Sequence, residues 1–175
     1  MNEPAAVADQ ADLLLELYDR ALPDVFGYLL RRCRSATVAE DLTAETFLAA
    51  VSAVKRGTVE RLTVAWLITV ARNKLVDHWR RLSREERMLQ LATSAVASAE
   101  DSEWDERLDE SRAMDVLSEL GPHHRIALTL KYLDGFTVPQ MAEQLGRTEH
   151  AAEALLARAR SAFRKSYGER SHDAS

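Results

Sequence analysis

One amphipathic, basic stretch restricts the fold of this chain more than any other feature: WLITVARNKLVDHWRR, at Trp66–Arg81. With 100° between successive residues, six apolar side chains fall on one face, which predicts a helix packed against a core. That face comprises Leu67, Ile68, Ala71, Leu75, Trp79 and Leu82. The opposite side carries Thr69, Asn73, Asp77, Arg80 and Trp66, flanked by Arg72, Lys74 and Arg81. Cations and an amide on one surface suit phosphates and unstacked bases, although a solvated helix face is the commoner explanation for such a stretch by itself.

Helical periodicity recurs through most of the chain and predicts an all-α fold. Pro23 lies inside the first pattern, where it favours either one helix or a second helix that begins there. Thr37, with Glu40 three residues later, is typical of a capping box. The expected helices are Asp12–Arg32 (whole or divided), Val38–Val54, Trp66–Arg81, Ala113–Leu120, Pro122–Leu133, Val138–Leu145 and Glu149–Tyr167.

The helix expected at Val38–Val54 carries an acidic pair on its outer side. We expect its buried face to comprise Ala44, Phe47, Leu48, Val51 and Val54. Asp41 and Glu45 then lie one turn apart beside an exposed Leu42, and like charges at this spacing repel each other. An uncompensated acidic pair beside an exposed leucine hints at a basic partner, although an ordinary solvated face is again the commoner explanation.

Charge follows a basic, acidic, basic order along the chain. The formal net charge of −5 argues against binding nucleic acid by bulk charge. Residues 72–84 hold five cations and one acid, residues 100–110 hold seven acids and one cation, and residues 147–170 hold six cations and three acids. Such a chain can touch a polyanion at two places and keep its middle away from it.

The middle of the chain has weak periodicity and is rich in Ala, Ser, Asp and Glu. Residues 92–102 are the best candidate for a linker. We therefore expect two small helical domains joined by a flexible acidic linker. The expected bounds are 10–84 for the first domain, 85–111 for the linker, 112–168 for the second domain and 169–175 for a tail.

The second half contains a helix-turn-helix pattern, for which two core helices joined by a turn are the alternative. Thr137 caps a short helix that ends at Gly146, and Thr148 caps a longer basic helix. Ala142 allows the two helices to cross closely. The long helix is expected to bury Ala152, Leu155, Leu156, Ala159, Ala162 and Phe163. Its outer face suits a DNA groove, with cations on phosphates.

No residue set indicates catalysis or a metal site. The five histidines have no carboxylate and nucleophile at a diagnostic spacing, and there is no glycine-rich phosphate loop. The single Cys33 cannot form an internal disulfide, and no Cys/His set has zinc spacing. No apolar run is long enough for a membrane span, and the acidic N-terminal stretch is unlike a signal peptide. We therefore expect a cytoplasmic protein that is not an enzyme and uses no cofactor or metal.

Three motifs occur in a characteristic order. AEDLTAETFLAAV (Ala39–Val51) comes first and WLITVARNKLVDHWRR second, followed by LSELGPHHRIALTLKYLDGFTVPQMAEQLGRT (Leu117–Thr148) with a terminal ARAR (Ala157–Arg160). Any one motif is weak, because many regulators contain a helix-turn-helix. In this order and at this length, the chain resembles the extracytoplasmic-function (ECF) group of bacterial sigma-70-type sigma factors over about residues 13–165.

The resemblance implies a subunit that binds core RNA polymerase and directs promoter recognition and melting. The first domain would bind the β′ clamp helices and the −10 element, and the second would bind the −35 element and the β flap. The residues implied in core polymerase binding are Asp41, Leu42, Glu45 and Phe47. Those implied at the −10 element are Lys55, Arg56, Arg61, Asn73, Lys74, Asp77, Arg80 and Arg81. An anti-sigma factor is a further expected partner.

The −35 contacts have two possible forms. The candidates are Arg125, Lys131, Thr148, His150, Glu153, Ala154, Arg158 and Arg160. Many family members have Lys or Arg followed by Ser-Arg early in this helix, where this chain has Glu153, Ala154 and Leu155. Either His150 and Glu153 read bases, the glutamate accepting from a cytosine amine, or the contact rests on cations at phosphates.

A helix-turn-helix regulator that binds duplex DNA without polymerase is the alternative function. It explains the second half of the chain but leaves the acidic pair and the Trp66–Arg81 stretch without a role. A small helical enzyme is a third hypothesis, which no residue set supports.

Overall fold

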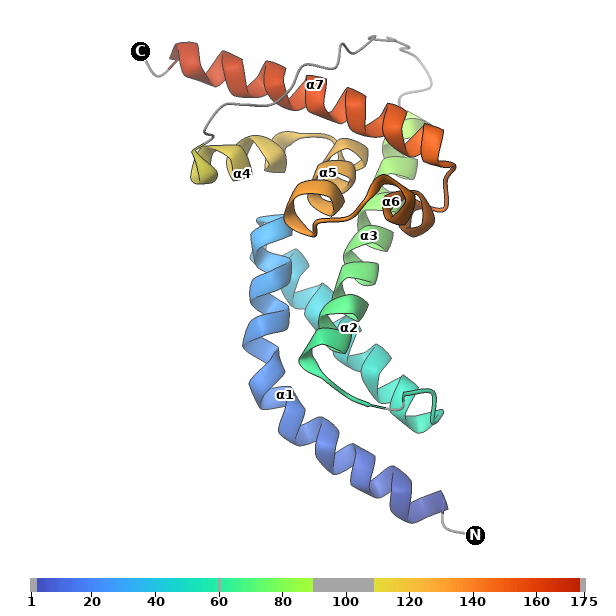
Figure 1. Ribbon diagram of the computed structural model, residues 1–175. Coiled ribbons are helices and arrows are strands. Elements are labelled where there is room, and N and C mark those ends of the chain that lie inside the picture. Colours follow the sequence, from blue (N-terminus) through green and yellow to red (C-terminus); the bar gives the residue numbers. More distant parts are fainter. Residues whose placement is uncertain (1–2, 60, 90–108, 174–175) are drawn as a thin grey trace. The chain divides into compact units, whose positions relative to one another are not determined.

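The computed structural model describes residues 3–59, 61–89 and 109–173 (Figure 1). These residues form helices joined by short loops, with no strand among them, which confirms the all-α prediction. The elements are α1 (Glu3–Cys33), α2 (Ala36–Lys55), α3 (Val64–Leu89), α4 (Glu110–Glu119), α5 (Pro122–Leu128), the π-helical turn η1 (Thr129–Leu133), α6 (Val138–Leu145) and α7 (Glu149–Asp173). The chain divides into two compact units, Met1–Asp77 and His78–Ser175.

In the first unit, α1 and α2 pack side by side as an antiparallel pair (Figure 1). Both helices bury small residues, including Ala21 on α1 and Ala50 on α2, which leave room for the two backbones to approach. The first half of α3 buries Leu67, Ala71 and Leu75, as its periodicity predicts.

The ends of α1 and α2 differ from the predictions. α1 is one helix that contains Pro23, so the proline does not begin a second helix. Arg34 then adopts a left-handed conformation (φ 55°), and its N–H donates to the carbonyl of Leu30 at 2.9 Å. This turn makes Ser35 the cap of α2, because its Oγ accepts from the N–H of Val38 at 3.4 Å. The predicted cap, Thr37, already lies within the first turn.

The segment between the predicted domains is partly helical. α3 is capped by Thr63, whose Oγ1 accepts from the N–H of Trp66 at 3.1 Å, and it continues to Leu89. The first residues of the expected linker therefore extend this helix. The centre of that linker, residues 92–102, lies outside the described residues. α4 begins after Asp109, whose Oδ1 accepts from the N–H of Arg112 at 2.8 Å.

In the second unit, α7 packs against α4, α5 and α6. The helix-turn-helix prediction is confirmed at each signal residue. Thr137 and Gln140 form a capping box at the start of α6. Gly146 ends α6 in the left-handed conformation (φ 59°), and the Oγ1 of Thr148 accepts from the N–H of Ala151 at 3.2 Å. α7 then runs beyond the predicted Tyr167 to Asp173, and Ala162 is half-buried instead of buried.

The helix predicted at Pro122–Leu133 changes its winding midway. Its α-helical part ends at Leu128, and η1 follows, closed by the N–H of Asp134 to the carbonyl of Thr129 at 3.0 Å. A π-turn takes more residues than an α-turn, so side chains after it move to another face. Leu133 is therefore 39% exposed, whereas Leu130 stays in the core.

Candidate functional site

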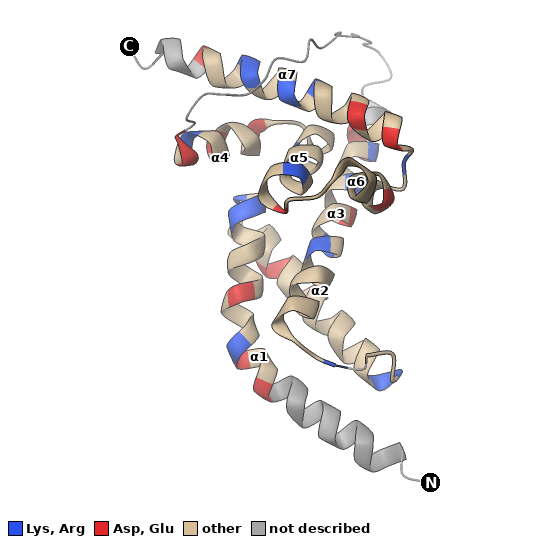
Figure 2. Ribbon diagram, viewed as in Figure 1, with Lys and Arg blue, Asp and Glu red and all other residues tan. Residues whose placement is uncertain are grey.

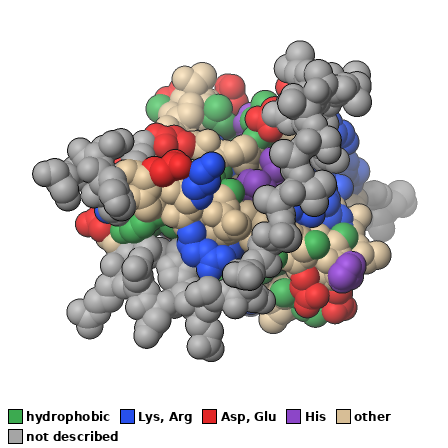
Figure 3. Space-filling model, turned by 90° about the horizontal axis from the view of Figure 1, so that it is seen from above, with side chains coloured by type: hydrophobic (Ala, Val, Ile, Leu, Met, Phe, Trp, Pro, Cys, Tyr) green, Lys and Arg blue, Asp and Glu red, His purple; other side chains and the backbone are tan. Residues whose placement is uncertain are grey.

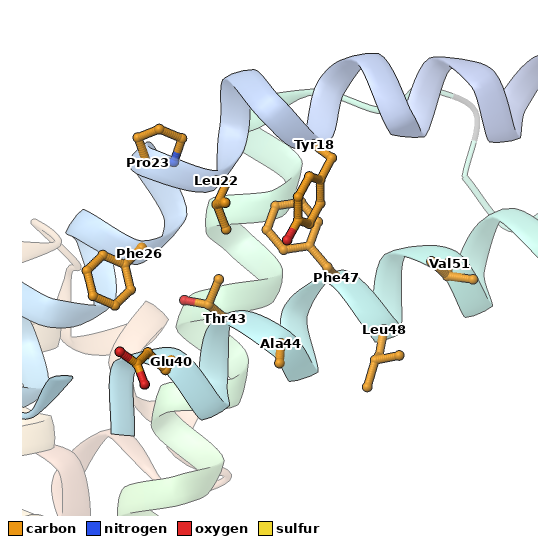
Figure 4. Close-up of a pocket in the computed structure, with 10 residues that line it drawn as sticks. All are labelled: Tyr18, Leu22, Pro23, Phe26, Glu40, Thr43, Ala44, Phe47, Leu48 and Val51. Carbon is orange, nitrogen blue, oxygen red and sulfur yellow. The ribbon is translucent and has the colours of Figure 1, made fainter. Parts of the chain in front are cut away.

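An apolar groove of about 770 Å³ runs between α1 and α2 (Figure 4). Tyr18 is 41% exposed and Leu48 is 66% exposed, and both line it. Figure 4 shows the rings of Tyr18 and Phe47 together, with centroids 4.6 Å apart in an edge-on arrangement. The other lining residues are Leu22, Pro23, Phe26, Glu40, Thr43, Ala44 and Val51. A groove with this lining suits the apolar face of another helix.

The groove exists because α2 turns a different face to the core from the one predicted. Ala44, Leu48 and Val51 were expected to be buried, but Ala44 and Leu48 are exposed and Val51 is half-exposed. Leu42, expected at the surface, is only 2% exposed. Apolar residues occur on nearly every side of α2, so periodicity could not single out its buried face.

Two of the four residues predicted to bind core polymerase lie instead in the hydrophobic core of this protein. Leu42 is buried, and Phe47 is 7% exposed beneath the groove. Asp41 and Glu45 are exposed on α2. Glu45 is not uncompensated, because its Oε2 lies 3.4 Å from the Nζ of Lys74 on α3. This ion pair corrects the prediction of an isolated acidic pair.

The end of α2 and the loop before α3 carry three of the predicted −10 cations. Lys55, Arg56 and Arg61 are exposed. Gly57, with φ 64°, provides the turn after α2, and the loop is anchored by Val59, which is 9% exposed. A cationic loop held at one apolar point can meet a phosphate chain without unfolding.

The predicted polar face of α3 is at the surface. Asn73, Asp77, Arg80 and Arg81 are exposed, and Lys74 is half-exposed. On the opposite face Trp79 is buried, whereas Ile68 and Leu82, predicted to join it, are half-buried. Trp66 is also half-buried. An exposed amide with cations farther along the helix can bind a base edge and a backbone together.

The outer face of α7 changes character along its length. Figure 2 shows acidic residues in its first turns and basic residues farther along. Thr148, His150 and Glu153 are exposed, as is Arg158, and Ala154 is half-exposed. On the face shown in Figure 3, basic side chains lie in separate groups among acidic and histidine side chains. The start of α7 therefore presents neutral and acidic groups, and its cations come later.

Two predicted −35 cations make hydrogen bonds within the second unit. The Nε of Arg125 donates to the carbonyl of Leu117 at 3.1 Å, and its Nη2 donates to that of Leu120 at 3.4 Å. These bonds satisfy carbonyls at the end of α4. The Nε of Arg160 donates to the Oη of Tyr132 at 2.8 Å. Lys131 is half-exposed, as are Arg125 and Arg160.

A contact that the sequence did not indicate joins the start of α4 to α7. The Oη of Tyr167 accepts from the backbone N–H of Asp109 at 3.1 Å. The guanidinium of Arg112 lies 4.1 Å from the centroid of the Tyr167 ring and donates to the Tyr167 carbonyl. These residues are more than fifty positions apart, and no local pattern connects them.

Within the described part of the chain, no group of three or more His, Cys, Asp or Glu residues is placed to hold a metal ion. Among the same residues, no helix has the length and apolar character needed to cross a membrane.

Both halves of the chain match known families. Residues 17–85 match Sigma-70 region 2, and residues 111–163 match Sigma-70, region 4. The ECF RNA polymerase sigma factor SigL of Mycobacterium tuberculosis is 34% identical over 155 residues, which cover 86% of each chain. The chain belongs to the ECF sigma factors. A second relative, the ECF RNA polymerase sigma factor BldN of Streptomyces coelicolor, is 35% identical over 159 residues. That match covers 88% of this chain but only 60% of the length of BldN.

A solved structure has a similar fold. The sigma factor RpoE of Bartonella quintana, determined in complex with the anti-sigma factor NepR, has a TM-score of 0.51 and 21% sequence identity. The match covers 89% of this chain and 96% of that chain. In the present protein, the residues that match region 2 include the α1–α2 groove and the polar face of α3. The residues that match region 4 include the helix-turn-helix.

Proposed function

We propose that this ECF sigma factor binds core RNA polymerase through the α1–α2 groove and directs it to promoters. The observation that carries this proposal is Leu48, a leucine 66% exposed beside an apolar groove. Exposed apolar surface of this kind marks an interaction site. Asp41 and Glu45 on the same helix favour basic groups on the partner. The family resemblance implies that this partner surface is the β′ clamp helices. Leu42 and Phe47 are buried and hold α2 in place by packing in the hydrophobic core.

The remaining surfaces are assigned to promoter DNA. Lys55, Arg56 and Arg61, with the polar face of α3, hold the separated −10 strand; captured bases offset the cost of unpairing and unstacking. Residues 10–84 form this domain, and 85–111 link it to the −35-binding domain at 112–168, which also docks on the β flap. The protein directs the polymerase in the cytoplasm and catalyses nothing itself.

At the −35 element, the exposed side chains at the start of α7 favour base reading by His150 and Glu153. Arg158 and Lys131 then contact phosphates, and Thr148 and Ala154 lie at the groove wall. We assign Arg125 and Arg160 both to bracing the second unit and to contacts with the DNA backbone. We also propose an anti-sigma factor as a partner, because the RpoE structure holds one.

The groove is tested with Leu48→Glu, which places a charge where an apolar partner surface would be buried. We expect its affinity for core polymerase, measured by fluorescence anisotropy, to fall at least about tenfold, with a matching loss of run-off transcription from pooled genomic fragments. Ala36→Glu, an exposed position on α2 outside the groove, is the matched control and should bind as the wild type does.

The alternative, a helix-turn-helix regulator that acts alone, predicts different behaviour. Such a protein binds promoter duplex tightly by itself and never copurifies with core polymerase. That result would reject the sigma function, as would run-off transcription that is unchanged by adding the protein to core polymerase.

A further inference from the structure

One ion pair joins the two helices that the proposed function assigns to different partners. The Nζ of Lys74, on α3, lies 3.4 Å from the Oε2 of Glu45, on α2. α2 carries the groove for polymerase, and α3 carries the face for the separated strand. The side chains are 35% exposed for Lys74 and 47% exposed for Glu45, so a partner can reach either one.

We propose that Glu45 masks Lys74 in the free protein, and that a basic group of the polymerase at Glu45 releases Lys74 to bind a strand phosphate. The ion pair thereby links polymerase binding to strand capture. This inference rests on the proposed function, because it describes how that site is regulated.

The physical basis is competition for one ammonium group. A carboxylate at this distance weakens the attraction of the Lys74 ammonium for other anions. A phosphate therefore has to displace Glu45 before it is attracted by the full charge of the ammonium. A partner cation at Glu45 removes that attraction. The lysine side chain is a compact charge on a flexible four-carbon chain, so its ammonium can move to a phosphate without movement of α3.

The size of the effect follows from the exposure of the pair. Exposed ion pairs are weak, and we therefore expect masking to lower strand affinity about two- to fivefold. The coupling is reciprocal: a strand bound at Lys74 strengthens polymerase binding at Glu45 by the same factor.

The test measures binding of the free protein to a fluorescein-labelled single-stranded oligothymidylate by anisotropy at low salt. Oligothymidylate is a suitable probe because an ammonium group contacts phosphates and does not read base edges. We expect Glu45→Gln to bind about two- to fivefold more tightly than the wild type, and to show a steeper salt dependence from one additional phosphate contact. Lys74→Gln should abolish this gain, so that the double variant binds like Lys74→Gln alone.

Asp24→Asn, a change of an exposed carboxylate on α1, is the matched control for bulk charge. An equal gain in this control would overturn the proposal, as would a gain that persists without Lys74. With saturating core polymerase present, Glu45→Gln and the wild type should bind the strand equally, since Glu45 is already engaged; a persistent difference rejects the release step. Wild-type run-off transcription tests the proposed function separately, so failure of one is distinguishable from failure of the other.

Discussion

His124 lies half-buried near the start of α5, and its ring centroid is 4.0 Å from that of His123. Burial lowers the pKa of His124 from 6.5 to about 4, and the charges of His123 and Arg158 act in the same direction. At neutral pH the side chain is therefore an uncharged part of the second unit.

This lowered pKa predicts a loss of stability in acid. Above pH 6.5 His124 is neutral in both the folded and the unfolded chain, so it does not change the free energy of unfolding with pH. Between pH 6.5 and about 4 the unfolded chain binds a proton that the folded chain does not, so the free energy of unfolding falls as pH falls. Urea denaturation followed by circular dichroism at pH 7 and pH 5 measures this loss. His124→Gln should lose less stability over this interval than the wild type, whereas His150→Gln, an exposed position, should lose as much; equal losses in all three proteins would contradict the assignment.

At the scale of elements, the turn between α6 and α7 depends on one backbone conformation. Gly146 has φ 59° and ψ 44°. This conformation lets the N–H of Arg147 donate a hydrogen bond to the carbonyl of Ala142 at 2.9 Å, which ends α6. Glycine adopts this left-handed conformation without the clash that a Cβ introduces. The crossing of α6 and α7 therefore relies on this residue.

Gly146→Ala should lower the free energy of unfolding by about 1 kcal/mol, because alanine is strained in the left-handed region. Gly168→Ala is the matched control, since Gly168 lies inside α7 without a positive φ and an added Cβ would meet nothing within 4 Å. There alanine should stabilise the protein by about 0.5–1 kcal/mol. Urea denaturation of both variants measures the two effects, and a shared sign would contradict this account of the turn.

α2 shows how far an element can be predicted. Its existence followed from periodicity, and the structure places it at Ala36–Lys55, close to the predicted Val38–Val54. Its buried face did not follow, because apolar side chains surround it. Packing against α1 buried Leu42 and left Leu48 at the surface. The groove was therefore missed, although the excess of apolar positions on α2 was a signal that some would remain uncovered.

At the scale of the whole molecule, the proposed function places the two tasks of region 2 on different helices, polymerase binding on α2 and strand binding on α3. Asn73 is exposed on α3. Asn73→Ala therefore removes an amide from the proposed strand-binding face without opening a cavity. We expect open-complex formation, measured by permanganate reactivity of unpaired thymines, to fall about tenfold while affinity for core polymerase is unchanged.

The complementary variant is Asp41→Lys with Glu45→Lys, which reverses the charge on α2. This double variant should abolish the affinity for core polymerase itself, since both carboxylates face the proposed partner. Loss of polymerase binding in Asn73→Ala would show instead that this residue is structural.

The sequence by itself determined the helices, the caps at Thr137 and Thr148, the turn at Gly146 and the family. These features depend on neighbours within one turn, or on motifs in a fixed order, so they can be predicted from the sequence. Only the tertiary structure decided which face of α2 is buried, that Glu45 pairs with Lys74, and that Arg125, Arg160 and Tyr167 bond to residues far away in sequence. Each of these depends on how one helix packs against another, and many packings are compatible with the same periodicity.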